Sequence, residues 1–149
     1  MSDSIKQKIQ EDMKAAMRAK EKQRLGTIRL MQAAIKQKEV DERISLDDTQ
    51  VITILDKMLK QRRDSLAQYE KADRQDLAEQ EAFEIKVIQA YMPQQLTETE
   101  INSLIEAAIN ETGATSIKEL GKVIGYLKPK VQGKVDMKAF TTSIKQRLS

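Results

Sequence analysis

The residues PQQLTETEINSLIEAAINETG, at positions 93–113, decide how this chain is organised. Pro93 has no backbone donor and ends the helical pattern before it. Thr97 and Glu100 have the spacing of a capping box, which opens a new helix. Apolar residues then recur at helical spacing: Ile101, Leu104, Ile105, Ala108 and Ile109. Gly113 is typical of the left-handed residue that follows a helix end. The stretch therefore predicts a domain boundary followed by a complete helix.

Helical periodicity continues on both sides of this stretch, and no sustained strand-like alternation occurs. We expect an all-α fold in two parts. Residues 1–95 are expected to form an N-terminal four-helix domain of long hairpins. Residues 96–149 are expected to form a small three-helix domain.

Several residues are expected to open or close individual helices. Ser45 is expected to accept from an early amide of the third helix, with acids beside it that suit a helix start. Asp73 or Asp76 is expected to open the fourth helix. Further along the chain, the expected signals are a capping box at Ser116–Glu119, a helix end before Pro129 and a cap at Asp136.

The composition excludes several classes of function. The chain has 149 residues and contains neither cysteine nor histidine, which rules out disulfides and thiolate zinc sites and removes the commonest general base. We expect no metal and no cofactor. The polar start and the lack of an apolar run near 18 residues predict a cytoplasmic protein without a membrane partner.

The net charge of +3 hides an uneven distribution. Acidic residues dominate between residues 96 and 119. Between residues 120 and 149 the only acid is Asp136, which stands against seven basic residues: Lys122, Lys128, Lys130, Lys134, Lys138, Lys145 and Arg147. Such a strongly basic end is typical of a surface that attracts phosphate groups.

Within this basic end, Gly121 and Gly125 lie one helical turn apart, so bare backbone would allow another surface to approach. The start of the last helix would add amides that favour phosphate. The candidate RNA-binding residues are Gly121, Lys122, Gly125, Lys128, Lys130, Gly133, Lys134 and Lys138. The alternative to RNA binding is that the lysines form an ordinary solvated face and the glycines only allow helices to pack closely. Aromatic residues make up 3% of the chain, so backbone and shape contacts would dominate over base stacking.

A second group of charged residues lies in the centre of the chain. Glu81 and Glu84 share a helix face, and paired carboxylates can serve acid–base or metal chemistry. We favour structural ion pairs with Arg62, Arg63 and Arg74 across a helical hairpin. No serine or lysine stands in a recognisable nucleophile setting, so no catalytic residue is assigned.

Four motifs together carry a resemblance to a known family. They are KQRRDS at 60–65, RxDLAxxExxEI at 74–85, YMPQQL at 91–96 and GKVIGYLKPKVQGKVD at 121–136. Over essentially its whole length the chain resembles the YqeY-like family, small bacterial proteins related to the C-terminal tail of GatB. GatB is the B subunit of the glutamine-dependent tRNA amidotransferase. Residues from about Leu96 onwards resemble that tail.

The resemblance implies a non-catalytic protein that binds tRNA or another structured RNA. In the amidotransferase the tail helps to hold tRNA, and the matching positions here run from Gly121 to Asp136. The family often has Arg-Ala-Asp-Gly where this chain has Lys134-Val135-Asp136-Met137. Lysine keeps the charge of arginine but loses its bidentate fork. Family labels also mention a carbon–nitrogen ligase with glutamine as amido donor. A protein-interaction adaptor that binds a partner through its N-terminal helices is the other alternative.

Overall fold

The computed structural model describes residues 4–149, and within that range the chain forms helices and no strand. The expected all-helical fold is confirmed. The chain divides into two compact units, one ending at Met92 and the other covering Pro93–Ser149. This division falls three residues before the predicted boundary at 95/96. The grouping into a four-helix and a three-helix domain stays a prediction.

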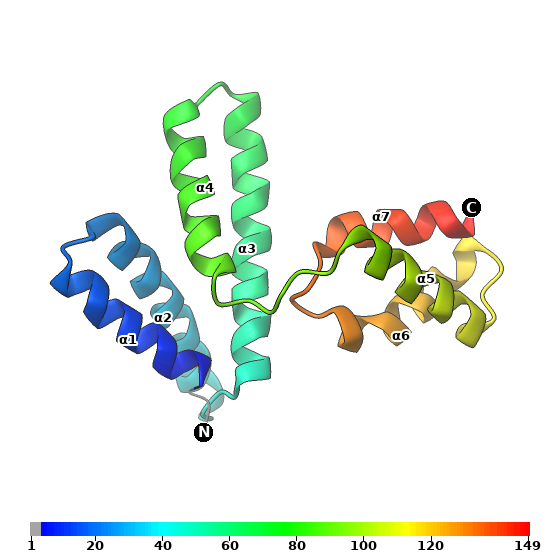
Figure 1. Ribbon diagram of the computed structural model, residues 1–149, viewed down its shortest axis with the longest axis horizontal. Helices are drawn as coiled ribbons and strands as arrows, with labels where there is room; N and C mark the ends of the chain where they lie inside the picture. The colour runs from blue at the N-terminus through cyan, green and yellow to red at the C-terminus, as the bar shows by residue number, and fades with distance from the viewer. Residues whose placement is uncertain (1–3) are drawn as a thin grey trace. The chain divides into compact units, whose positions relative to one another are not determined.

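The first unit consists of two helical hairpins (Figure 1). One pairs α1 (Ile5–Arg18) with α2 (Lys22–Glu42), and the other pairs α3 (Asp48–Lys71) with α4 (Gln75–Gln89). The turns are short, and each contains a non-glycine residue in the left-handed region: Lys20, Arg43 and Asp73. These tight connections place consecutive helices side by side, which brings the charged residues of α3 and α4 together.

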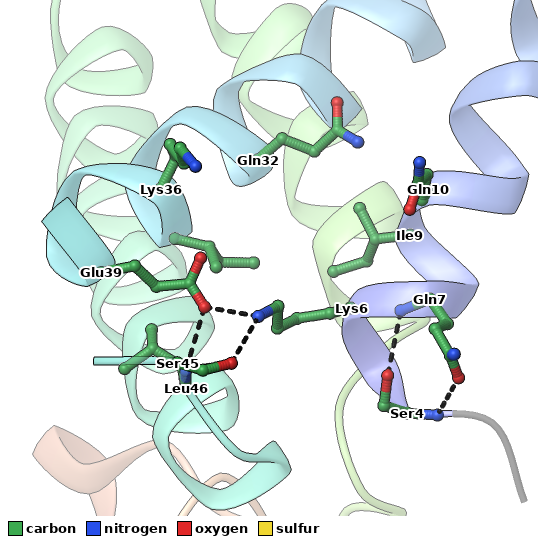
Figure 2. A pocket seen from close by; sticks show the side chains of 11 residues that line it. Ser4, Lys6, Gln7, Ile9, Gln10, Gln32, Lys36, Glu39, Ser45 and Leu46 are labelled. Carbon is green, nitrogen blue, oxygen red and sulfur yellow. Dashed lines mark hydrogen bonds and ion pairs between the residues drawn. The ribbon is translucent and has the colours of Figure 1, made fainter. Parts of the chain in front are cut away.

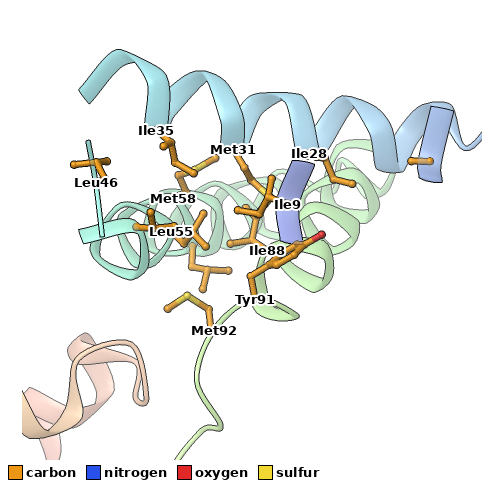
Figure 3. Packing of buried hydrophobic residues seen from close by; sticks show 13 residues of the cluster. Ile9, Ile28, Met31, Ile35, Leu46, Leu55, Met58, Ile88, Tyr91 and Met92 are labelled. Atoms are coloured by element: carbon orange, nitrogen blue, oxygen red, sulfur yellow. The ribbon is translucent and has the colours of Figure 1, made fainter. Parts of the chain in front are cut away.

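A single core joins the two hairpins, as Figure 3 shows. Ile28, Met31 and Ile35 point from one face of α2 toward Leu55 on α3 and Ile88 on α4. Ile9 joins them from α1. All but Ile35, which is 5% exposed, are 1% exposed or less. Each large apolar side chain buried in this way contributes about 1.5–3 kcal/mol.

Two predicted caps in this unit are wrong. Asp47, rather than Ser45, caps α3, because its carboxylate accepts from the Gln50 amide at 2.9 Å. Ser45 instead accepts from Lys6 on α1 at 3.3 Å. Arg74 holds the N-cap position of α4 without a side-chain bond, since Asp73 adopts the left-handed turn conformation. Asp76 lies within the first turn of α4 and pairs with Arg74.

The second unit contains α5 (Glu98–Thr112), the 3-10 turn η1 (Ile117–Glu119), α6 (Leu120–Val131) and α7 (Met137–Leu148). The predicted capping box of α5 is confirmed by the Glu100 amide, which donates to Thr97 Oγ1 at 3.2 Å. Gly113 ends α5 with a φ of 70°, as expected. The core of this unit is lined by Ile105, Val123, Leu127, Val131, Phe140 and Ile144.

Two further expectations fail around α6. Ser116 forms no side-chain cap; the carboxylate of Glu119 instead accepts from the Thr115 amide at 3.1 Å. The helix also continues through Pro129 to Val131. A proline ring inside a helix meets the carbonyl four residues earlier. Here that residue is Gly125, which is exposed, and Pro129 lies in the last turn, where few helical bonds remain to be lost.

Candidate nucleic-acid interface

One face of α6 packs into the core of the second unit and the opposite face is open. Val123, Leu127 and Val131 are completely buried. Gly121 and Gly125 lie on the exposed side, and a Cβ placed at either position would have no neighbouring atom within 4 Å. No helix of the described chain therefore packs on these glycines. This observation weighs against the alternative in which they serve helix packing.

Lysines border the strip formed by Gly121 and Gly125. At 3.6 residues per turn, Lys122 and Lys128 lie on opposite sides of this glycine strip, and both are exposed. Lys130 lies further round the helix, with its Nζ 4.6 Å from the centre of the Tyr126 ring. Tyr126 packs against the core while its hydroxyl accepts from Lys130 at 3.4 Å. Tyr126 therefore has a rim role in which it positions a lysine.

Pro129 removes one hydrogen bond from α6. In a regular helix the amide of residue 129 would donate to the carbonyl of residue 125. Pro129 has no amide hydrogen, and its ring lies against that carbonyl instead.

The turn between α6 and α7 is held by residues that precede α5. Gly133 is buried with a φ of 76°, and its carbonyl accepts from Gln95 Nε2 at 2.8 Å. The amide of Leu96 donates to the carbonyl of Lys134 at 2.9 Å. Gly133 is therefore a structural residue of the turn, and the Lys134 side chain is half-buried beside it.

The start of α7 is less available to phosphate than the sequence suggested. Asp136 accepts from the amide of Lys138 at 3.1 Å, so a carboxylate already occupies part of the helix start. Lys138 itself is exposed in the first turn. Of the eight candidate residues, Gly121, Lys122, Gly125 and Lys128 share one face of α6. Lys130 lies on the other side of that helix, over Tyr126, and the other three belong to the turn and to α7.

Ion pairs within residues 4–149 do not neutralise the positive charge of this region. None of the seven basic side chains between Lys122 and Arg147 forms an ion pair with any residue in the described range 4–149. Unpaired cations keep their attraction for an external anion, and two of them, Lys122 and Lys128, lie on the glycine face of α6.

The central charged cluster has a different arrangement from the one predicted. Arg62 on α3 donates from Nε to Glu84 on α4 at 3.1 Å, and both side chains are largely buried. Arg63 donates instead to the side-chain carbonyl of Gln89 at 3.2 Å. Arg74 pairs with Asp76 at the exposed end of the hairpin at 3.3 Å. The structure thus joins one arginine to one of the two predicted acids.

Glu81 lies in the same hairpin without a compensating bond. Its Oε2 is buried and has no hydrogen-bond partner. Burial raises the pKa of Glu81, the neighbouring Glu84 adds to the shift, and Arg62 opposes it. The charged form of Glu81 is therefore disfavoured in the folded state.

A cavity that the sequence did not indicate lies between α1, α2 and the segment that leads into α3 (Figure 2). It has a volume of about 780 Å³, and the Lys6–Glu39 ion pair closes one side. Glu39 also accepts from the Leu46 amide at 2.9 Å. The bond from Lys6 lowers the pKa of Glu39, and the bond from Leu46 adds to this effect. These residues come from three separate segments, so no local pattern could have revealed the cavity.

A smaller cavity of about 270 Å³ adjoins Tyr91, within the YMPQQL motif. The hydroxyl of Tyr91 donates to Asp12 on α1. Burial raises the pKa of Tyr91, and the bond to Asp12 strengthens the shift. Tyr91 therefore stays neutral and ties the end of α4 to α1, which is a structural role.

Residues 6–148 match the family described as Yqey-like protein. The chain belongs to the YqeY-like family. Several fungal relatives of this YqeY-like chain carry the name "Altered inheritance of mitochondria protein 41, mitochondrial".

Three of these relatives illustrate the extent of the similarity. The protein of Vanderwaltozyma polyspora is 32% identical over 75% of this chain, and the match spans 64% of the relative's length. The protein of Kluyveromyces lactis is 40% identical over 56% of this chain and 45% of its own length. That of Pyrenophora tritici-repentis is 31% identical over 85% and 71%. The chain therefore spans less than two thirds of the length of the first two relatives.

The expectation of a bacterial, cytoplasmic protein is contradicted by these comparisons, because the relatives are eukaryotic and are named as mitochondrial proteins. The cytoplasmic expectation rested in part on the polar first residues, and such residues do not distinguish a cytoplasmic protein from a mitochondrial one. Within residues 4–149 the structure also bears on membrane spans and metal sites. No helix there has the length and apolar character needed to cross a bilayer. No group of three or more acidic side chains is arranged to hold a metal ion.

Proposed function

We propose that this YqeY-like protein binds tRNA or another structured RNA through the exposed face of α6, and that it has no catalytic role of its own. The observation that carries the proposal is the open glycine strip at Gly121 and Gly125, bordered by the unpaired Lys122 and Lys128. The similarity of this segment to the tail of the amidotransferase B subunit adds support. A carbon–nitrogen ligase has no supporting nucleophile in the sequence.

The chemistry of the face suits an RNA backbone better than bases. Lysines attract phosphates through charge and through the release of counterions. The bare backbone of the glycine strip permits an approach that a side chain would block. With Tyr126 engaged by the core and by Lys130, little base stacking is expected.

The test compares two variants of the full chain with equal charge changes. One replaces Lys122, Lys128 and Lys130 by Glu. The control replaces Lys14, Lys57 and Lys71, three exposed lysines of the first unit, by Glu. Affinity for a purified tRNA is measured by filter binding at several salt concentrations, and folding is checked by circular dichroism.

The wild type is expected to lose affinity with salt at a log–log slope of roughly −2 to −5, as for three to five phosphate contacts. The α6 variant is expected to bind more weakly with a shallower slope, and the control to retain most of the affinity. Equal binding by the two variants would contradict the assignment of the α6 face.

A further inference from the structure

Helix α2 carries a second apolar line on the side opposite the core. Its apolar members are Gly26, Leu30, Ala33 and Val40, and the polar Gln37, which donates to Asp41 at 2.9 Å, completes a spacing that alternates between four and three residues. All five are exposed, with Leu30 at 46% and Val40 at 60%. A Cβ at Gly26 would meet no atom within 4 Å. Nothing in the described chain covers this seam.

The fold of the first unit does not explain the seam. The core contacts of α2 come from Thr27, Ile28, Met31 and Ile35 on its other face. A surface helix normally has one apolar stripe and charged residues opposite. Here α2 has two stripes, and the spacing of the outer one is that of a coiled-coil seam.

A basic flank runs along one side of the seam. Lys22, Arg29 and Lys36 recur every seven residues, so they occupy equivalent positions in successive heptads. All three are exposed, and none forms an ion pair with a residue of the part of the chain that the structure describes. In coiled coils, charges at these edge positions select the partner helix.

We propose that α2 is a docking surface for an amphipathic helix of another protein, whose acidic residues face Lys22, Arg29 and Lys36. The four–three spacing keeps the seam on one line facing a partner helix. The small residues Gly26 and Ala33 allow the two backbones to approach closely. From Gly26 to Val40 the seam is about 21 Å long at 1.5 Å per residue, which matches a partner segment of about four turns.

A second copy of this chain fits the seam less well than an acidic helix. In an antiparallel pair of α2 helices, the basic flank would face its own copy, and like charges would repel. In a parallel pair, the flank would face Thr27, Ala34 and Asp41, which provide one acid for three cations. An RNA would satisfy the charges but would leave Leu30 and Val40 exposed.

The test uses a synthetic peptide of three heptads with leucine at the seam positions and glutamate at both edge positions. Its glutamates disfavour pairing between two peptides but are complementary to the basic flank of α2. A second peptide carries lysine at the edges. Binding of each labelled peptide to the full chain is measured by fluorescence anisotropy. Three forms are compared: the wild type, a flank variant with Lys22, Arg29 and Lys36 changed to Glu, and the seam variant L30E/V40E.

The wild type is expected to bind the acidic peptide and not the basic one. The flank variant should bind the acidic peptide about tenfold more weakly and gain binding of the basic peptide. The seam variant should bind neither while it remains folded and retains its affinity for tRNA. Equal binding of both peptides, or of neither, would overturn the proposal. So would a dimer of the wild type in sedimentation that L30E/V40E abolishes, since the seam would then hold a second copy.

Discussion

Arg62 Nε and Glu84 Oε2 form an ion pair across the α3–α4 hairpin at 3.1 Å, with 15% and 12% of their side chains exposed. Arg62 also donates to the carbonyl of Met58 on its own helix at 3.4 Å. The guanidinium therefore fixes the position of α4 against α3. This pair joins two of the motifs by which the sequence resembles its family, KQRRDS and the acidic segment that ends at Ile85.

Replacement of Arg62 by Met is expected to destabilise the first unit by about 3 kcal/mol, because Glu84 would be left as a largely buried, unpaired charge. The double variant R62M/E84M should recover much of that loss, since no isolated charge remains. Urea unfolding of the full chain, followed by circular dichroism, measures both. A double variant that is as unstable as the sum of its two single variants would show that the pair is not coupled.

Replacement of Glu81 by Gln is expected to stabilise the protein at pH 7 by about 1 kcal/mol, the usual scale of a single substitution, because the amide lacks the charge that burial and Glu84 disfavour. The pKa of Glu81 is raised by burial and by Glu84, so the folded chain binds a proton more tightly than the unfolded chain. The wild type should therefore lose stability as pH rises through that raised pKa, and the variant should not. Urea midpoints measured from pH 4 to 8 would reveal the difference. A variant that is less stable than the wild type at every pH would contradict this account.

The helices could be predicted from the sequence because apolar spacing and capping residues are local signals. Thr97, Glu100 and Gly113 behave as their residue types imply. Ser45 does not, because Lys6 from another helix captures its hydroxyl, and that contact depends on the fold. The helix α6 ends at Val131 rather than before Pro129, because a proline in the last turn removes only one helical hydrogen bond.

The candidate site could likewise be predicted only where local spacing determines it. The face that holds Gly121, Lys122, Gly125 and Lys128 follows from helical spacing alone. The partners of Arg63 and Arg74 depend on the register of one helix against the next, which no single helix encodes. The role of Gly133 depends on Gln95, which lies far from it in sequence.

Replacement of Glu39 by Gln is expected to remove a stabilising contribution that the wild type has at neutral pH. The bond from Lys6 and the bond from the Leu46 amide lower the pKa of Glu39 in the folded chain. A lowered pKa stabilises the fold above the pKa of the unfolded chain, about 4.3 for glutamate, and this gain is lost as pH falls through the folded value. Urea midpoints from pH 7 to 3 test the effect.

The matched control for Glu39 is Glu70→Gln, a change at an exposed glutamate on α3. The Glu39 variant should show a lower midpoint than the wild type at pH 7, and the two should converge near pH 3. The control should follow the wild type throughout. A Glu39 variant whose midpoint stays parallel to the wild type down to pH 3 would show that the ion pair with Lys6 does not contribute through titration.

Two substitutions in the glycine strip of α6 test whether Gly121 and Gly125 have a structural role in the fold. Gly121→Ala and Gly125→Ala are each expected to stabilise the second unit by about 0.5–1 kcal/mol, because alanine favours the helix and glycine does not. Neither new Cβ would meet an atom within 4 Å. Urea unfolding of the full chain measures this gain, and a loss of stability would mean that the strip is covered.

Gly125→Leu tests the RNA proposal at the same position. The larger side chain has open space around it and favours the helix over glycine, so the variant is expected to fold with at least wild-type stability. It should nevertheless lower the affinity for tRNA by about tenfold, or 1.4 kcal/mol, because leucine would hold the backbone of α6 away from a phosphate chain. The control is Ala107→Leu, at an exposed position on α5. Unchanged tRNA binding by Gly125→Leu would show that close approach to the strip plays no part, even if the lysines attract RNA.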